Sequence, residues 1–407
     1  MIMIRKYGLL TIIAISINAC VSEFNVLEFQ KENNLRLVDS NATKETVLLF
    51  YNMKMLSNRN TIFGHHDATA YGIGWRGEEG RSDVKDVTGS YPGLYGWDFG
   101  VLTWEPNVKN EERRITRLVS EAYSRGGVNA FCWHAPNPVT DRSFYDTTVA
   151  IPKILPGGGY YLKYLRMLDQ IADFVETLKD SSGKPIPIIF RPFHEFDGSW
   201  FWWGKNFCTP QEFKKLWRTT VEYLRDKRGL RNILYAYSPD RNFYSEEEYL
   251  ERYPGDEYVD ILGMDDYYDF MPDGDGLEWI KKKLRIVTVL AEKKNKIAAF
   301  TETGLEGIVD SEWWTEKLYK TIEGDSVRIA YLMVWRNANE KHHYAPYKGH
   351  PSEDDFVKFT LTEKILLERD LPNLYSEPID GEIIKRINLN QRVELLKAVL
   401  TYPITVN

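Results

Sequence analysis

A charged cluster lies among aromatic residues in the segment RPFHEFDGSWFWWG, residues 191–204. Its acidic centre is Glu195, which has Phe193, Phe196 and Trp200 as close neighbours in the sequence. Apolar surroundings disfavour the charged form of a carboxyl group and raise its pKa, which suits a group that donates a proton near neutral pH. We therefore predict that Glu195 acts as a general acid.

A second candidate carboxylate, Glu302, lies in the segment FTETG, residues 300–304. The neighbouring hydroxyls of Thr301 and Thr303 are able to donate hydrogen bonds that favour an ionised carboxylate. Two carboxyl groups, one neutral and one ionised, are what hydrolysis of a glycosidic bond requires, with one as proton donor and the other as nucleophile. We therefore predict that Glu302 is the nucleophile.

Several tryptophans are candidate platforms for a sugar, because a large rigid ring offers apolar surface at a low entropic cost. Trp133, Trp200 and Trp335 each lie at or just beyond the end of a predicted strand. The roles of Phe201, Trp202 and Trp203 stay open at this point, since each side chain either faces a ligand or belongs to the core.

The elements that must position these residues form a regular alternation along the chain. Apolar runs rich in β-branched and aromatic residues predict buried parallel strands. Longer helical patterns separate several of them, for example over residues 161–180, 210–227 and 277–294. Eight such units predict a closed (β/α)8 TIM barrel, an α/β fold, as a single domain. The runs span residues 61–66, 93–99, 128–134, 186–195, 232–240, 259–267, 297–304 and 329–336.

Polar residues gather at the carboxyl ends of these runs, and those ends meet at one face of a barrel, where active sites are built. An open doubly wound sheet is the alternative fold. Such sheets carry a Gly-rich phosphate turn after the first strand. Here the first run ends in GHHDA, residues 64–68, without that turn.

The N-terminus has the pattern of an export signal. Two basic residues and a short apolar run precede Ala19–Cys20, which is typical of a lipoprotein signal peptide. We expect cleavage after residue 19 and a lipid on Cys20, with an ordinary signal peptide as the alternative. Residues 20–42 are then expected to form a polar tether, residues 43–365 the catalytic barrel beginning with a helix over 43–56, and residues 366–407 a C-terminal extension packed on it.

Composition and charge exclude other classes of function. The formal net charge of −7 and the lack of a basic stripe argue against nucleic acid as a partner.

His194–Glu195 resembles the start of a zinc motif, but position 198 is Gly, so the second histidine ligand is missing. We expect no metal and no cofactor, and we interpret His342, His343 and His350 as solvated loop residues. A disulfide between Cys132 and Cys208 is permitted but not implied.

The segment over residues 191–204 closely resembles the acid/base segment of glycoside hydrolase family 26, whose members are mostly endo-β-1,4-mannanases with a (β/α)8 barrel. The resemblance extends over about residues 43–365, through the segments 71–84, 90–99, 131–138, 260–269, 300–304 and 334–337. It implies a retaining mechanism with Glu195 as acid/base and Glu302 as nucleophile. Further residues that it implies as sugar contacts or supports of the acidic pair are Trp133, His134, Arg191, His194, Trp200, Tyr267 and Trp335.

The substrate that this resemblance implies is β-mannan or manno-oligosaccharides. We expect the protein to be a monomer, and the N-terminal signal leads us to expect that it is exported and lipid-anchored to the bacterial cell envelope. The membrane is expected to be a partner only through the lipid. Two alternatives stay open: the same machinery acting on another β-glycan, such as β-1,3-xylan or mixed-linkage glucan, and a glycan-binding lipoprotein without catalysis. The presence of both Glu195 and Glu302 favours an enzyme over the second alternative.

Overall fold

Eight parallel strands form a closed barrel in the computed structural model, which describes residues 24–104, 108–387 and 389–390. Each strand pairs with the next in the chain, and the last returns to the first through the register Ile62↔Tyr331 and His65↔Val334. This confirms the prediction of a single (β/α)8 barrel. The strands are β1 (Thr61–His66), β4 (Leu94–Asp98), β5 (Val128–Cys132), β6 (Ile188–Arg191), β7 (Ile233–Tyr237), β8 (Ile261–Asp266), β9 (Ile297–Thr303) and β10 (Tyr331–Val334).

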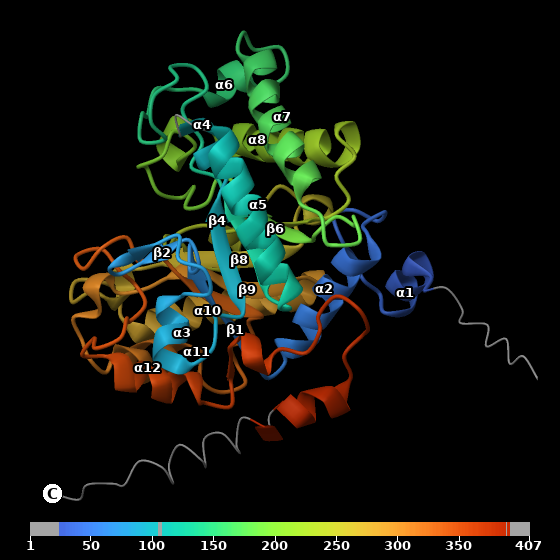
Figure 1. The fold of residues 1–407 in the computed structure, drawn as a ribbon. Helices are drawn as coiled ribbons and strands as arrows, with labels where there is room; N and C mark the ends of the chain where they lie inside the picture. Colours follow the sequence, from blue (N-terminus) through green and yellow to red (C-terminus); the bar gives the residue numbers. More distant parts are fainter. Residues whose placement is uncertain (1–23, 105–107, 388, 391–407) are drawn as a thin grey trace, which may run out of the picture.

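Helices connect successive strands and surround the barrel (Figure 1). The predicted helix over residues 277–294 matches α10 (Leu277–Lys294), which ends at Asn295 in the left-handed conformation. Helix α8 (Pro210–Glu222) begins at a capping box formed by Thr209 and Glu212, and a π-helical turn, η2 (Tyr223–Lys227), extends it. The other α-helices of the described chain after residue 43 are α2 (Lys44–Leu56), α3 (Asp83–Thr88), α4 (Val101–Trp104), α5 (Val108–Ser124), α6 (Ile151–Ile154), α7 (Tyr161–Thr177), α9 (Glu246–Leu250), α11 (Tyr319–Ile322) and α12 (Glu353–Thr360).

Two small strand pairs lie outside the eight-stranded ring. Strands β2 (Tyr71–Gly72) and β3 (Trp75–Arg76) form an antiparallel hairpin after β1. Strand β11 (Ile365–Leu366) pairs in parallel with the start of β1. The hairpin therefore extends the face at which the carboxyl ends of the strands meet, whereas β11 lies toward the opposite end.

The predicted tether over residues 20–42 is folded where the structure describes it, from residue 24 onward. Helix α1 (Val26–Glu32) is capped by the side chain of Asn25. After α1 the chain reaches the N-terminal end of β8, where Asp260 accepts a hydrogen bond from the backbone N–H of Val38 at 2.7 Å. Backbone groups satisfied by a buried carboxylate hold this segment on the barrel, which is why it is not an unstructured tether.

The C-terminal extension lies against α2 at the same end of the barrel (Figure 1). Asn52 of α2 donates to the carbonyl oxygens of Leu374 and Glu377, each at 2.9 Å, and accepts from the N–H of Ile379 at 2.8 Å. One buried amide therefore fixes the path of the extension across α2.

Among the described residues, we find no helix that is both long and apolar enough to cross a membrane. The predicted signal peptide and Cys20 lie outside the described residues.

Candidate active site

The two predicted carboxylates are placed by strands that lie apart in the barrel order. Glu302 belongs to β9, and Glu195 follows β6 in a tight turn. The hydroxyl of Tyr267 donates to Oε1 of Glu302 at 2.7 Å, and the guanidinium of Arg191 contacts Oε2. Each oxygen of Glu302 thus has its own partner, so its orientation is fixed. The adjacent Tyr268 is 42% exposed and bonds Asp273 instead.

Glu195 is held in an unusual backbone conformation, with φ at +55°. Its N–H donates to the carbonyl oxygen of Ser238 after β7 at 2.9 Å, and its carbonyl oxygen accepts from the N–H of Gly198 at 3.0 Å. A non-glycine residue in the left-handed region costs conformational energy and persists where the surroundings over-determine it. The turn therefore fixes the direction in which the Glu195 side chain points.

The environment of Glu195 suits a proton donor. Burial, reinforced by the nearby charge of Glu302, raises the pKa of Glu195 to about 7. The indole Nε1–H of Trp200 donates to Oε2 of Glu195 at 2.7 Å and opposes part of that increase. The raised pKa allows Glu195 to hold its proton closer to neutral pH than a solvated carboxyl group does, as a proton donor requires.

Arg191 joins two buried carboxylates beneath the site. Its guanidinium contacts Asp265 of β8 as well as Glu302, and its pKa is raised because these charges outweigh the effect of burial. Asp265 also accepts from the hydroxyl of Thr301 at 2.7 Å. Asp265 was not among the predicted site residues, although it lies near the carboxyl end of the predicted strand run over residues 259–267.

His134 is oriented by a carboxylate at the end of β4. Its Nδ1 lies 2.8 Å from Oδ2 of Asp98, and its backbone N–H donates to Oδ1 at 3.0 Å. Burial lowers the pKa of His134, but the charge of Asp98 outweighs it and the net pKa is raised; the same pair lowers the pKa of Asp98 to about 2. We interpret the pair as an imidazolium and a carboxylate that fix the ring at the site.

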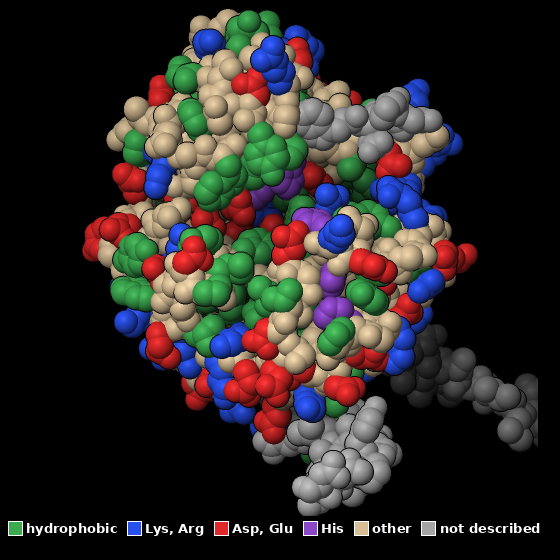
Figure 2. All heavy atoms as spheres, turned by 90° about the vertical axis from the view of Figure 1, so that its left-hand side faces the viewer, with side chains coloured by type: hydrophobic (Ala, Val, Ile, Leu, Met, Phe, Trp, Pro, Cys, Tyr) green, Lys and Arg blue, Asp and Glu red, His purple; other side chains and the backbone are tan. Residues whose placement is uncertain are grey.

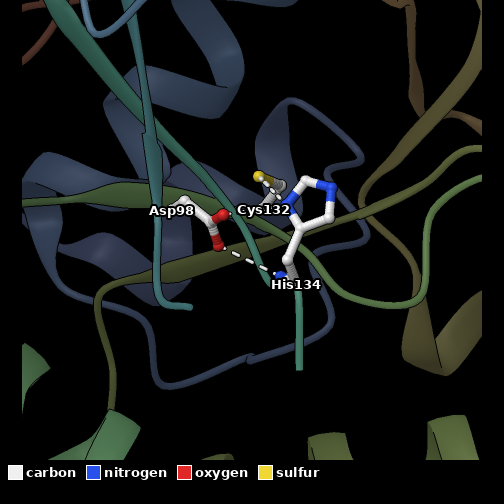
Figure 3. A group of neighbouring side chains, drawn as sticks. All are labelled: Asp98, Cys132 and His134. Carbon is white, nitrogen blue, oxygen red and sulfur yellow. Dashed lines mark hydrogen bonds and ion pairs between the residues drawn. The ribbon is translucent and has the colours of Figure 1, made fainter. Parts of the chain in front are cut away.

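Asp98, Cys132 and His134 also form a group of possible metal ligands, with ligand atoms within 4.8 Å of one another. Figure 3 shows Asp98 and Cys132 converging on His134. Burial raises the pKa of the Cys132 thiol well above its usual value, and Nδ1 of His134 is already engaged by Asp98. The geometry therefore favours a hydrogen-bonded network that orients His134.

His194 lies buried under aromatic rings beside Glu195. Burial, with a contribution from the charge of Arg191, lowers the pKa of His194 well below its usual value, so the ring is neutral. The Phe201 ring lies 5.2 Å from the His194 ring, and the indole N–H of Trp203 donates to the His194 carbonyl oxygen at 2.7 Å. Its predicted contact with sugar stays a prediction.

The structure also assigns the remaining aromatic residues of this segment. Phe201, Trp202 and Trp203 are all buried, and the indole N–H of Trp202 donates to the carbonyl oxygen of Ala135 at 3.0 Å. Phe201 stacks on Trp203 with ring centroids 4.5 Å apart. The three residues therefore build the wall of the site.

Two of the three predicted platforms have a ring surface that remains accessible. Trp200 is 38% exposed, and Trp335 is half-buried with its ring 4.2 Å from that of His66. Trp133 differs from the prediction. It is only 1% exposed and packs against Tyr164 and Phe193, so its ring belongs to the core.

A hollow crosses the middle of one face of the molecule, with acidic, basic and histidine side chains inside it and hydrophobic side chains on its rim (Figure 2). Next to Trp335, Arg336 lines a cavity of about 440 Å³ together with Tyr71, Trp75 and Arg76 from the β2–β3 region. Arg336 donates to the hydroxyl of Tyr71 at 3.2 Å. The β2–β3 hairpin therefore contributes polar and aromatic side chains to a cavity beside Trp335.

Two of the three late-loop histidines differ from the prediction that all three are solvated. Of the late-loop histidines, His343 and His350 are buried, with their Nε2 atoms 3.2 Å apart, whereas His342 lies nearer the surface and contacts Glu306. Cys132 and Cys208 are both free thiols.

Comparison with known proteins identifies relatives over nearly all of the barrel. The model of the family described as "Glycosyl hydrolase family 26" matches residues 38–356. A mannan endo-1,4-β-mannosidase of Bifidobacterium adolescentis is 35% identical over 360 residues, which cover 82% of this chain and 36% of that protein. The chain therefore spans only about a third of the length of this relative.

Solved structures resemble the chain over most of its length. A family 26 β-mannanase of Bacteroides ovatus is 43% identical with a TM-score of 0.79, covering 83% of this chain and 99% of that one. A family 26 protein of Muricauda sp. is 41% identical with a TM-score of 0.81, covering 86% and 98% respectively.

Proposed function

The chain belongs to glycosyl hydrolase family 26, and we propose that it hydrolyses β-1,4-mannosidic linkages in mannan, galactomannan or glucomannan with retention of configuration. The observation that carries the proposal is the pair of unlike carboxyl groups. Glu195 has a pKa raised to about 7, and Glu302 is fixed by Arg191 and Tyr267. The names of the relatives above support mannan as the substrate.

In the first step, the carboxylate of Glu302 attacks the anomeric carbon while Glu195 gives its proton to the glycosidic oxygen. The bond between that carbon and the oxygen breaks, the leaving chain departs as an alcohol, and a covalent glycosyl-enzyme remains on Glu302. Fixing Glu302 through Tyr267 and Arg191 limits the reorientation that the attack requires.

In the second step, water attacks the anomeric carbon from the side that the leaving group vacated. Glu195, now ionised, takes one proton from this water, and the bond to Glu302 breaks. Two inversions at one carbon give net retention. A pKa near 7 allows Glu195 to serve as acid in the first step and as base in the second.

The walls of the site suit a chain of pyranose rings. Trp200 bonds Glu195, so we place the leaving sugar at Trp200. The ring of Trp335 lies 4.2 Å from that of His66, and we propose that it contacts the sugar on the other side of the cleavage point. Aromatic faces pack on the apolar C–H faces of sugars, while the polar groups between them satisfy hydroxyls. We propose Trp200, Trp335, His134 and His194 as sugar contacts.

The test is reducing-sugar release from mannan, xylan and lichenan in parallel, with Glu302→Ala as the inactive control. We expect release from mannan, a loss of several orders of magnitude in kcat for the variant, and an unchanged melting temperature. Release only from xylan or lichenan would show that the substrate is that β-glycan and not mannan. A Glu302→Ala variant as active as the wild type would refute the assignment of Glu302 as the nucleophile. A product with inverted anomeric configuration, detected by proton NMR, would refute the retaining mechanism.

We further propose that residues 1–19 are a signal peptide and that Cys20 carries the lipid that anchors the protein to the bacterial cell envelope. The basic start, the apolar run and Ala19–Cys20 support this. Intact-mass analysis of the membrane fraction tests it: we expect an acylated N-terminal cysteine, and an unmodified Cys20 would contradict the anchor.

A further inference from the structure

Tyr145 is an exposed aromatic residue next to the buried wall of the site. It lies in the loop between β5 and α6 and is 61% exposed. Its ring stacks on that of Phe201, with centroids 5.6 Å apart and planes at 26°. The preceding residue, Phe144, packs against His134 at 4.6 Å. The loop therefore covers His134 with one ring and presents the next ring to solvent.

The exposure of Tyr145 is not caused by a loosely held loop. Asn137 donates to the carbonyl oxygens of Asp146 and Thr148 at 2.8 and 2.7 Å. The backbone N–H of Trp202 donates to the carbonyl oxygen of Phe144 at 3.2 Å. The peptide groups on both sides of Tyr145 are thus tied to fixed partners, and a large ring is held in water where it gains little from burial.

The position of Tyr145 relates it to the reacting groups. Phe201, on which it stacks, also contacts the ring of Trp200 at 6.1 Å, and Trp200 bonds the acid Glu195. The pKa of the Tyr145 hydroxyl is raised by burial and by the charge of Glu195, and the charge of Arg336 opposes this. The Tyr145 hydroxyl is therefore close enough to the acid Glu195 and to Arg336 for both charges to act on it.

We propose that Tyr145 is a substrate-positioning residue whose ring stacks on a pyranose of the glycan and forms, with Trp200, one aromatic edge of the cleft. This inference rests on the proposed function. Such a contact forms in the bound substrate and persists in the transition state. It therefore lowers KM and leaves kcat nearly unchanged.

The experiment compares Tyr145→Ala and Tyr145→Phe with the wild type on mannohexaose. The matched control is Tyr160→Ala, because Tyr160 is also an exposed tyrosine but precedes α7. An aromatic contact of about 0.5–1.5 kcal/mol corresponds to a change of about two- to tenfold in affinity. We expect KM to rise by that factor in Tyr145→Ala, with kcat within about twofold. Tyr145→Phe and Tyr160→Ala should retain the wild-type KM.

The kinetics of the wild type and of the two Tyr145 variants distinguish failure of this inference from failure of the proposed function. A wild type that hydrolyses mannohexaose, together with an unchanged KM in Tyr145→Ala, would overturn this inference and leave the proposed function intact. A KM raised equally in Tyr145→Phe would overturn the stacking role, because the ring is preserved there. A wild type without activity on mannohexaose would overturn the proposed function first. Equal melting temperatures of all variants exclude misfolding as the cause.

Discussion

The indole Nε1–H of Trp200 donates a hydrogen bond to Oε2 of Glu195 at 2.7 Å. This contact makes Trp200 more than a surface for sugar, because a donor to the ionised carboxylate lowers its pKa. Burial and the charge of Glu302 act in the opposite direction and dominate, with the pKa of Glu195 raised to about 7. Trp200 therefore tunes the group that must gain and lose a proton in each turnover.

Replacing Trp200 by Phe removes the donor and keeps a ring. The pKa of Glu195 should then rise above about 7. Because Glu195 must be protonated in the first step, the alkaline limb of the kcat/KM profile should move to higher pH. The maximum value of kcat/KM should also fall, because the smaller ring stacks less well on a sugar. A profile from about pH 4 to 10 measures both effects. An alkaline limb that moves to lower pH, or a similar shift in Trp279→Phe on α10, would contradict the assignment.

Arg191 is the cation between two buried carboxylates, so its removal should be costly. Arg191→Met leaves Asp265 and Glu302 without their shared partner. Removing one member of a buried ion pair costs about 3–5 kcal/mol. We expect a loss of that size in the free energy of unfolding, measured with urea, and kcat near background.

The control for this variant is Arg117→Met, which removes an exposed pair with Glu121. Exposed pairs contribute less than about 1 kcal/mol. Equal losses of stability in the two variants would show that Arg191 has no special electrostatic role.

Trp133 and Trp335 provide a matched comparison between a core ring and a ring in the site. Trp133→Leu should lower the free energy of unfolding by about 2–4 kcal/mol because a cavity forms, while KM stays unchanged. Trp335→Leu should raise KM or lower kcat and change stability little, because its ring is only half-buried. Urea unfolding and kinetics on a manno-oligosaccharide separate the two. A raised KM in Trp133→Leu, without loss of stability, would restore its predicted contact with sugar.

The barrel and its reactive face were predictable because strand signals are local. A strand buried on both faces is a continuous apolar run, and polar residues at its carboxyl end mark the site. The fourth predicted run extended to residue 195, but strand β6 ends at Arg191. The chain turns there because Pro192 follows and because Phe193 and Glu195 adopt the left-handed conformation.

Other features depend on contacts that are distant in sequence. Trp133 follows β5 and was predicted to face the ligand, but strand position alone does not say which way a side chain points. The contact that holds the second half of the predicted tether has no local signal either, because Val38 is bonded by Asp260, a partner 222 residues away. The bridge from Arg191 to Asp265 likewise joins β6 to β8 and has no local signal.

Asp98 and His134 lead to a prediction about stability and pH. In the folded state the pKa of Asp98 is lowered to about 2 and that of His134 is raised. The Asp98 contribution is present above its unfolded pKa of about 3.9 and is lost as pH falls through about 2. The His134 contribution is complete below its unfolded pKa of about 6.5 and is lost as pH rises through the higher folded value.

The ion pair therefore stabilises the fold most between these limits, and Asp98→Asn should reveal it. The variant should lose more free energy of unfolding at about pH 5.5 than at a pH above the raised folded pKa of His134, where the wild type has lost the charge on His134 as well. Asp98 also accepts hydrogen bonds from the backbone N–H groups of Gly100 and His134. Any stability lost with these two bonds is the same at both pH values, so it cancels when the two losses are subtracted. Glu306→Gln is the matched control, since it removes the partner of the more exposed His342 and should show little dependence on pH. An equal loss at both pH values in Asp98→Asn would mean that the two side chains share a neutral hydrogen bond, and His134 would then enter the site uncharged.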